Sequence, residues 1–149
     1  METKKSFAQI ITEFNSMYKL PVSDKPMLQP IERLQNFKNI LTEEVNEVDD
    51  IIEKYKQFSE SGNIGQQEKI ELLTDISDWL ADMTWYIRSE SAKFGIDLEK
   101  TLNIIGDSNF SKLGADGKPI YDERGKLMKG PGYWKPEPKI AEMIETQLK

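Results

Sequence analysis

Two stretches of the chain combine a helical pattern of apolar residues with closely spaced acidic residues. The first spans residues 34–55 and contains the acidic run 43–47, and the second spans residues 72–94 and contains the acidic run 75–82. In both stretches apolar residues recur every three or four positions, the spacing that places side chains on one face of an α-helix. We therefore expect two long amphipathic helices whose apolar faces are buried against other helices.

Several of these acidic residues fall on or beside the apolar faces. At about 100° per residue, Glu44 lies within the apolar arc of the first helix, Glu47 lies at its edge and Glu43 lies outside it. Three further carboxylates follow one border of the apolar arc of the second helix: Asp75, Asp78 and Asp82. Packing the two helices through these faces would bring several negative charges together.

Carboxylates near a buried helix face are unfavourable unless something compensates them, because an isolated charge that leaves water costs on the order of several kcal/mol. A hard divalent cation such as Mg²⁺ compensates them, since it prefers oxygen ligands. With 26 acidic residues in a chain of 149, similar pairs also arise by chance on solvated helix faces. The second acidic border and the position of Glu44 favour a metal site over a solvated face.

The composition excludes several classes of catalytic site. The chain contains no histidine and no cysteine, which rules out Ser-His-Asp and Cys-His catalysis, HExxH zinc chemistry and thiolate metal sites. A net charge of −6 disfavours a nucleic-acid-binding surface, which requires a basic face. The sequence shows neither a membrane-spanning apolar run nor a secretion signal, so we expect a cytoplasmic protein that binds neither membranes nor nucleic acid.

The hydrophobic pattern, together with the positions of proline and glycine, predicts an all-α fold. We expect an antiparallel bundle of four to five helices with a short C-terminal hairpin or loop, in a single domain covering residues 1–149. Its helical core would span about residues 4–108, and a basic segment with a terminal helix would span about residues 109–149. In chain order, the predicted elements are helices at about 4–18, 30–60 and 66–94, a helix from the N-cap Asp97, a hairpin within 118–129 and a helix within 137–148.

Two further positions have both a packing and a functional interpretation. Asn15 lies inside the first helical pattern, where we expect an exposed helix residue. Trp85 falls away from the apolar arc of its helix. Its position indicates a subunit contact or a wall against which a base stacks, with packing as the simpler alternative.

The acidic pattern resembles a known family. Glu43, Glu44 and Glu47, followed by an acidic helix that ends in Asp82, are similar to the EExxE…ExxD signature of the all-α nucleoside triphosphate pyrophosphohydrolases. This superfamily includes MazG, the dimeric dUTPases and phosphoribosyl-ATP pyrophosphohydrolase. The resemblance spans roughly residues 7–136, because the segments 107–113, 116–120 and 125–131 are similar to the tail of MazG-like members.

One position departs from the family pattern, which has Glu three residues before the final Asp. This chain has Trp79 there, and Asp78 is the expected substitute because it is closer in angle to Asp82 than Trp79 is. Asp75 is an alternative. The resemblance therefore implies a site for Mg²⁺, with Mn²⁺ as an alternative, and the expected ligands are Glu44, Glu47, Asp78 and Asp82.

The resemblance also implies an activity, namely cleavage of a nucleoside triphosphate between the α and β phosphates to give a nucleoside monophosphate and pyrophosphate. Glu43 and Glu44 are the candidate catalytic residues, with Glu43 orienting or deprotonating the attacking water. The candidates for binding the substrate phosphates are Asn109, Lys112, Lys126 and Lys129.

Two alternative functions stand beside this interpretation, and an oligomeric state is predicted as well. Phosphoribosyl-ATP hydrolysis is the enzymatic alternative within the same fold. A non-catalytic helical regulatory partner, which would use its acidic stripe as a docking face, is the alternative from another class. The wide apolar faces of the two long helices and the resemblance together predict a homodimer or a dimer of dimers, with the active site close to the interface.

Overall fold

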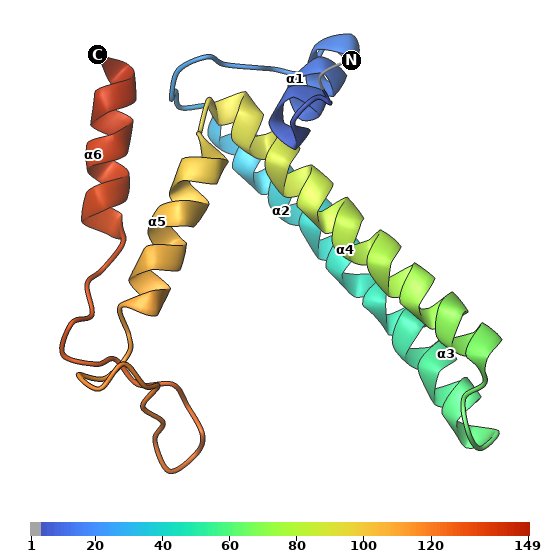
Figure 1. The fold of residues 1–149 in the computed structure, drawn as a ribbon. Helices are drawn as coiled ribbons and strands as arrows, with labels where there is room; N and C mark the ends of the chain where they lie inside the picture. The colour runs from blue at the N-terminus through green and yellow to red at the C-terminus, as the bar shows by residue number, and fades with distance from the viewer. Residues whose placement is uncertain (1–3) are drawn as a thin grey trace. The chain divides into compact units, whose positions relative to one another are not determined.

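The computed structural model describes residues 4–149, and these divide into two compact units. Unit 1 contains the described residues up to Ser23 together with Met27–Phe94, and unit 2 contains Asp24–Pro26 and Gly95–Lys149. Residues 1–3 of the predicted domain lie outside the described part, and the single domain with a division near residue 108 stays a prediction. The described residues form the following helices (Figure 1): α1 (Phe7–Met17), α2 (Ile31–Asn46), α3 (Val48–Glu60), α4 (Gln66–Phe94), α5 (Leu98–Phe110) and α6 (Glu137–Leu148).

The all-α fold class predicted from the sequence is confirmed. In residues 4–149 the β-structure consists of one isolated antiparallel bridge, between Tyr121 and Leu127. None of the helices in this range combines the length and the apolar composition that a membrane-spanning helix requires.

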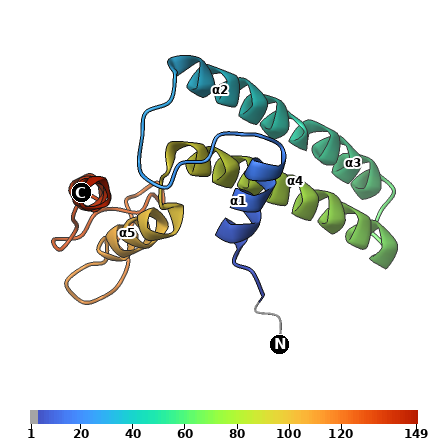
Figure 2. The same ribbon diagram turned by 90° about the horizontal axis from the view of Figure 1, so that it is seen from above.

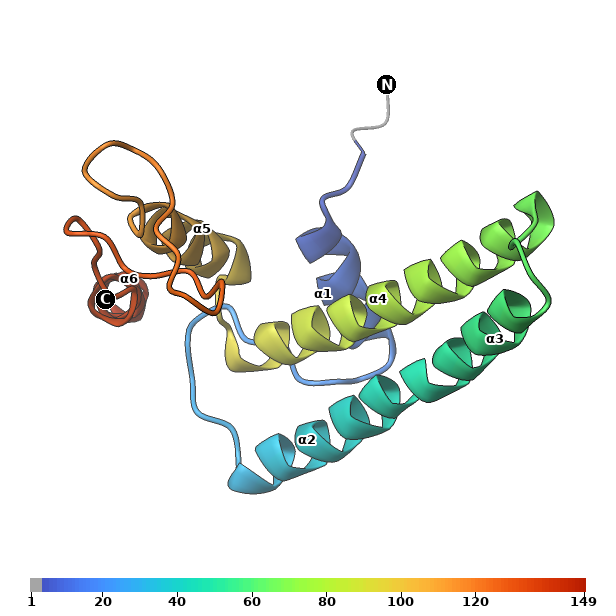
Figure 3. The same cartoon turned by 90° about the horizontal axis from the view of Figure 1, so that it is seen from below.

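Unit 1 is organised around α4. The helices α2 and α3 follow one another along α4 and run antiparallel to it (Figures 1 and 3). The indole Nε1 of Trp79 on α4 donates a hydrogen bond to the backbone oxygen of Glu44 on α2, at 2.8 Å. Further along, Lys54 of α3 pairs with two acidic residues of α4. These contacts define one antiparallel register, in which the end of α2 and the start of α3 face the middle of α4.

The sequence predicts one continuous helix over about residues 30–60, and the structure shows two helices, divided at Glu47. This residue has φ −60° and ψ −20°, and its N–H donates to the oxygen of Glu44, three residues back, at 3.2 Å. A bond to the residue three back tightens the turn and interrupts the regular i→i−4 pattern. The prediction of one helix was therefore wrong at Glu47, which is itself one of the expected metal ligands.

The helix α1 packs across α4 (Figure 2). It begins at a capping box in which the Ser6 hydroxyl accepts a hydrogen bond from the Gln9 N–H, and the Gln9 side chain accepts one from the Ser6 N–H. Trp85 of α4 contacts the rings of Phe7 and Phe14 edge-to-face, at centroid distances of 5.7 and 5.1 Å. Trp85 thus packs against α1, which agrees with the packing alternative for this residue and not with a subunit contact or a base-stacking wall.

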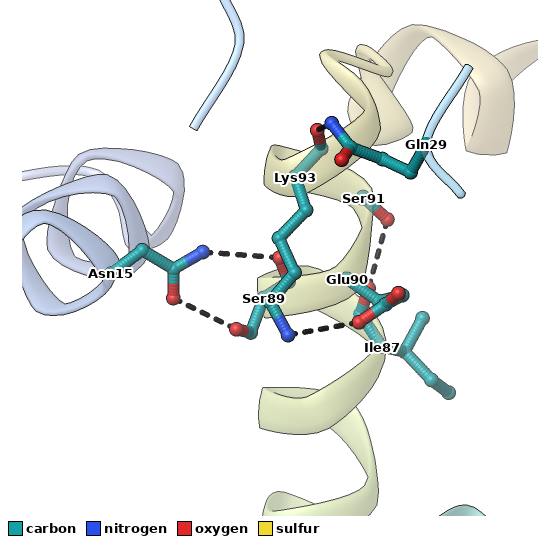
Figure 4. A network of polar contacts seen from close by, with 7 residues as sticks. All are labelled: Asn15, Gln29, Ile87, Ser89, Glu90, Ser91 and Lys93. Carbon is teal, nitrogen blue, oxygen red and sulfur yellow. Dashed lines mark hydrogen bonds and ion pairs between the residues drawn. The ribbon is translucent and has the colours of Figure 1, made fainter. Parts of the chain in front are cut away.

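A buried polar contact joins α1 to α4 (Figure 4). The Asn15 amide Nδ2 donates to the backbone oxygen of Ser89 at 3.1 Å, and the Ser89 hydroxyl donates to Asn15 Oδ1 at 2.8 Å. Asn15 is 0% exposed, so the expectation of an exposed helix residue was wrong. Asn15 lies one turn after Ile11, which is also completely buried, so the two residues share the face of α1 that packs against α4.

Asn15→Ala should lower the free energy of unfolding by about 2–4 kcal/mol, because it removes two hydrogen bonds and leaves the buried Ser89 hydroxyl without its acceptor. Urea denaturation followed by circular dichroism measures the change. Asn39→Ala is the matched control, since Asn39 is exposed on α2 and its replacement should stay within about 0.5 kcal/mol. Equal stability of the two variants would show that the contact does not hold α1 in place.

The loop between α1 and α2 closes the C-terminal end of α4. The N–H of Ser23 donates to Ala92 O at 3.0 Å, and the N–H of Met27 donates to Phe94 O at 2.9 Å. The Gln29 side chain donates to the intervening carbonyl, that of Lys93, at 2.8 Å (Figure 4). The last carbonyls of a helix have no partners within the helix, so this loop supplies the hydrogen bonds that they lack.

Unit 2 consists of α5, the predicted hairpin and α6. The Asp97 side chain accepts a hydrogen bond from the Lys100 N–H at 3.1 Å, which confirms the predicted N-cap of α5. The hairpin is confirmed by the bridge between Tyr121 and Leu127 and by a tight turn closed from Gly125 N to Asp122 O at 3.0 Å. The predicted terminal helix is present as α6, which packs against α5.

Candidate functional site

Glu44 and Glu90 are both buried in unit 1 at 7% exposure, but Glu90 pairs with Lys93 whereas Glu44 has no cation beside it among the ion pairs of the described residues. Glu44 lies in the last turn of α2 and is only 7% exposed, and its Oε1 atom is buried without a hydrogen-bond partner. Burial raises the pKa of Glu44 above its ordinary value, and the negative charges of Glu47, Asp82 and Asp78 raise it further, in that order. The other three residues predicted as metal ligands are therefore close enough to Glu44 to act on it electrostatically.

The helix register explains how these four residues come together. Glu44 lies in the last turn of α2 and Glu47 separates α2 from α3, while Asp78 and Asp82 lie one turn apart on α4. The hydrogen bond from Trp79 to the Glu44 backbone aligns the two helices at this level. Glu47, Asp78 and Asp82 are exposed, so Glu44 forms the buried base of an acidic site whose other members are open to solvent.

These carboxylates fit a divalent cation in chemistry, because they accept hydrogen bonds and cannot donate them when ionised. The unpartnered, buried Glu44 oxygen is the specific observation in favour of such an ion, since a buried anion among like charges is otherwise uncompensated. In residues 4–149, no group of three or more acidic side chains is already arranged as a set of metal ligands. The assignment of Glu44, Glu47, Asp78 and Asp82 as ligands therefore stays a prediction.

Asp75, the alternative ligand, has a different environment. Lys54 donates a hydrogen bond to Asp75 and also contacts Glu71 Oε1 at 3.0 Å. These bonds, with the bond to Asp75 contributing most, raise the pKa of Lys54. Asp75 is thus engaged with an ammonium group, whereas Asp78 acts on Glu44, and this contrast favours Asp78 over Asp75 as the fourth ligand.

Glu43 and Tyr86 border the same site. Glu43 is exposed on α2, consistent with its predicted position outside the apolar arc. Tyr86 lies one turn after Asp82 on α4, and its pKa is raised by burial and then by Glu44, Asp82, Glu47 and Glu43. Tyr86 is not among the site residues predicted from the sequence. Its spacing of four from Asp82 was the available signal, because residues four apart share a helix face.

The predicted phosphate-binding residues lie in unit 2. Lys112 Nζ donates to Asn109 Oδ1 at 2.7 Å, at the end of α5. The ammonium of Lys129 lies 4.6 Å from the centre of the Tyr133 ring. A backbone hydrogen bond of 2.8 Å from Gly130 N to Lys112 O brings these two segments together. Lys126 lies apart from them on the hairpin turn, where its N–H donates to Asp122 Oδ1 and its side chain is exposed.

Comparison with known proteins identifies the fold. The chain is similar to the crystal structure of a "putative NTP pyrophosphohydrolase" from Exiguobacterium sp. 255-15, with a TM-score of 0.52 and 22% sequence identity over 97% of this chain and 98% of that one. No protein-family model and no curated protein sequence matches the chain. The arrangement of its helices is therefore that of an all-α NTP pyrophosphatase-like fold.

Proposed function

We propose that this protein is a Mg²⁺-dependent nucleoside triphosphate pyrophosphohydrolase of the MazG-like branch. Its substrate is an NTP or a dNTP, which it cleaves between the α and β phosphates to release a nucleoside monophosphate and pyrophosphate. The observation that carries the proposal is the buried, unpartnered carboxylate of Glu44 among three like charges. The fold, similar to that of a protein described as an NTP pyrophosphohydrolase, supports the same reading.

In this proposal, Glu44, Glu47, Asp78 and Asp82 hold the metal, which is Mg²⁺ or Mn²⁺. A divalent cation held there supplies charge neutralisation and Lewis-acid activation for phosphoryl chemistry. The exposed carboxylate of Glu43, next to Glu44, accepts the proton of the attacking water. The hydroxyl of Tyr86, one turn from Asp82, donates a hydrogen bond to a substrate phosphate.

The basic residues of unit 2 bind the substrate phosphates. Asn109 and Lys112 already contact one another at 2.7 Å, and together they present amide and ammonium donors. Lys129 is held over the Tyr133 ring, which restricts where its charge can lie. Lys126 is exposed and contributes a further charge from the hairpin turn.

The homodimer is also part of the proposal. Large apolar side chains are exposed on both long helices of unit 1, including Leu34 at 54% on α2 and Leu73 at 63% on α4. On α4 they border an open groove of about 570 Å³. Exposed apolar surface of this kind is typical of association sites. Asp78 lines the same groove, so a second copy packed there would lie beside the proposed metal site.

A substrate panel tests the proposal. The full-length protein is incubated with Mg²⁺ and each of the common NTPs, dNTPs and phosphoribosyl-ATP, and the products are identified by ³¹P NMR. We expect pyrophosphate and a nucleoside monophosphate from at least one NTP or dNTP. Release of orthophosphate with a nucleoside diphosphate, or no product from any substrate, would contradict the proposed reaction. Turnover of phosphoribosyl-ATP alone would contradict the proposed substrate class.

A further inference from the structure

The break between α2 and α3 lies at the carbonyl group that Trp79 contacts. The Glu44 oxygen accepts two hydrogen bonds, one from the indole Nε1 of Trp79 at 2.8 Å and one from the Glu47 N–H at 3.2 Å. In a continuous helix the same oxygen would accept a bond from the N–H four residues ahead, that of Val48. Within residues 4–149 no hydrogen bond joins the Val48 N–H to this oxygen, and α3 begins at Val48. A bond from another helix is therefore present where the helical bond is lost.

The sequence of α2 and α3 offers no local cause for the break. Residues 31–60 contain neither proline nor glycine, and the apolar residues continue at helical spacing across Glu47. The bond from Glu47 N spans three residues, which excludes a π-bulge, where the bond spans five. The remaining common cause of a helix break is a group that inserts into the i→i−4 ladder. The indole N–H of Trp79, which reaches the ladder from α4, is such a group.

The tight turn also changes the direction of the Glu47 side chain. Side chains three residues apart are offset by about 60° around a regular α-helix, whereas they are nearly eclipsed in a 3₁₀ turn. Glu47 has φ −60° and ψ −20°, which are values of the 3₁₀ type. The turn from Glu44 to Glu47 therefore brings these two carboxylates closer to one line along the helix than an unbroken helix would.

We propose that Trp79 is a positioning residue whose indole N–H diverts the Glu44 carbonyl from the helical ladder, sets the break at Glu47 and so aligns the two carboxylates. The consequence for metal binding rests on the proposed function, whereas the origin of the break does not. Tryptophan suits this role because its N–H is a donor only, and a half-buried indole needs an acceptor. A carbonyl oxygen has two lone pairs, so it holds this bond and the bond from Glu47 together.

Amide hydrogen exchange in the full-length protein tests the inference without metal. Trp79→Phe keeps an aromatic ring and removes the donor, so the Glu44 carbonyl becomes free to accept a bond from Val48. We expect the Val48 amide to exchange about 10-fold more slowly than in the wild type, because it gains a hydrogen bond. NMR of ¹⁵N-labelled protein in EDTA measures the rate. Trp79→Leu is measured in parallel as a second variant without a donor, and circular dichroism checks the helical signal of each.

Trp79→His makes the converse test, because it loses the six-membered ring and keeps an N–H. The imidazole Nε2 occupies the same position in its five-membered ring as the indole Nε1, and at about pH 8 the imidazole is neutral. The Val48 amide should then exchange at the wild-type rate. Trp85→Phe is the matched control on α4, since Trp85 contacts rings of α1, and it should not slow exchange at Val48.

The direction of the change separates the proposed role from packing alone. If the indole only packs, its removal loosens the contact between the helices, and Val48 exchanges at the same rate or faster. That result in both Trp79→Phe and Trp79→Leu would overturn the inference. Slower exchange at Val48 in Trp79→His or in Trp85→Phe would overturn it as well, because the effect would then not depend on the donor of Trp79.

Mn²⁺ binding connects the break to the proposed metal site. Loss of a group that orients metal ligands costs about 10- to 100-fold in affinity, so Trp79→Phe should weaken Mn²⁺ binding by a similar factor. Titration with Mn²⁺ alone, with the free ion measured by electron paramagnetic resonance, gives the affinity. Slower Val48 exchange with unchanged Mn²⁺ affinity would overturn the alignment of the two carboxylates. A wild type that binds no Mn²⁺ would remove the proposed metal site, while the exchange rates would still decide the origin of the break.

Discussion

Glu44→Gln should reduce the rate of pyrophosphate release by about 100-fold or more while the protein keeps its helical circular dichroism spectrum. The substitution preserves the shape of the side chain and removes the negative charge at the buried base of the proposed metal site. Loss of residues that only orient metal ligands typically costs 10- to 100-fold, so loss of a ligand should cost at least as much. The measurement is pyrophosphate release at saturating Mg²⁺ with the best substrate of the panel.

In the absence of metal, the same variant should be more stable than the wild type at neutral pH, although it is less active. The folded state raises the pKa of Glu44 above the ordinary value of 4.5. Between the ordinary pKa and the raised pKa of the folded state, the folded protein binds more protons at Glu44 than the unfolded protein does. The stability of the wild type therefore falls as pH rises through this range. Above the raised pKa the difference is constant. In EDTA, the wild type should therefore lose thermal stability relative to Glu44→Gln as pH rises from 4.5, and it should regain stability with Mg²⁺ at pH 7.

Glu60→Gln serves as the matched control for both measurements. Glu60 is an exposed carboxylate at the end of α3, away from the break at Glu47. Its replacement should leave pyrophosphate release unchanged and should not alter the response of the melting temperature to Mg²⁺ or to pH. Full activity of Glu44→Gln, or identical melting behaviour of Glu44→Gln and the wild type, would remove Glu44 from the proposed metal site.

Gly130→Ala should destabilise unit 2 by about 3 kcal/mol, because there is no room for a methyl group at this position. An added Cβ would lie 1.9 Å from the Leu113 carbonyl oxygen and 2.6 Å from its carbon. Both are backbone atoms, so relief of the overlap requires the two segments to separate. Separation breaks the hydrogen bond from Gly130 N to Lys112 O and moves Lys112 away from Lys129.

Hydrogen–deuterium exchange of residues 108–134, together with urea denaturation, measures this effect. Gly132→Ala is the matched control, because an added Cβ at Gly132 meets no atom within 4 Å. The control should show protection close to that of the wild type, and Gly130→Ala should show faster exchange and weaker substrate binding. Equal exchange in the two variants would mean that the close approach of residue 130 to Leu113 does not hold unit 2 together.

Several features of the fold depend only on residues that are close together in the chain, and these could be predicted from the sequence. The bounds predicted for α4, the N-cap Asp97 and the hairpin turn are confirmed, because each depends on residues within a few positions of one another. The break at Glu47 was missed, since the apolar pattern continues across it. Tyr86 was not predicted as a neighbour of the acidic site, because a helical wheel places a residue on a face without showing which charges lie opposite.

Apart from the break at Glu47, the sequence by itself determined where the long helices lie and that Glu44 lies on an apolar face, because both follow from the helical repeat. Only the tertiary structure decided that Asn15 is buried against Ser89 and that Asp75 is paired with Lys54. These contacts join residues that are 74 and 21 positions apart. They depend on which helices pack together and in which register, and a periodic pattern within one helix carries no record of either.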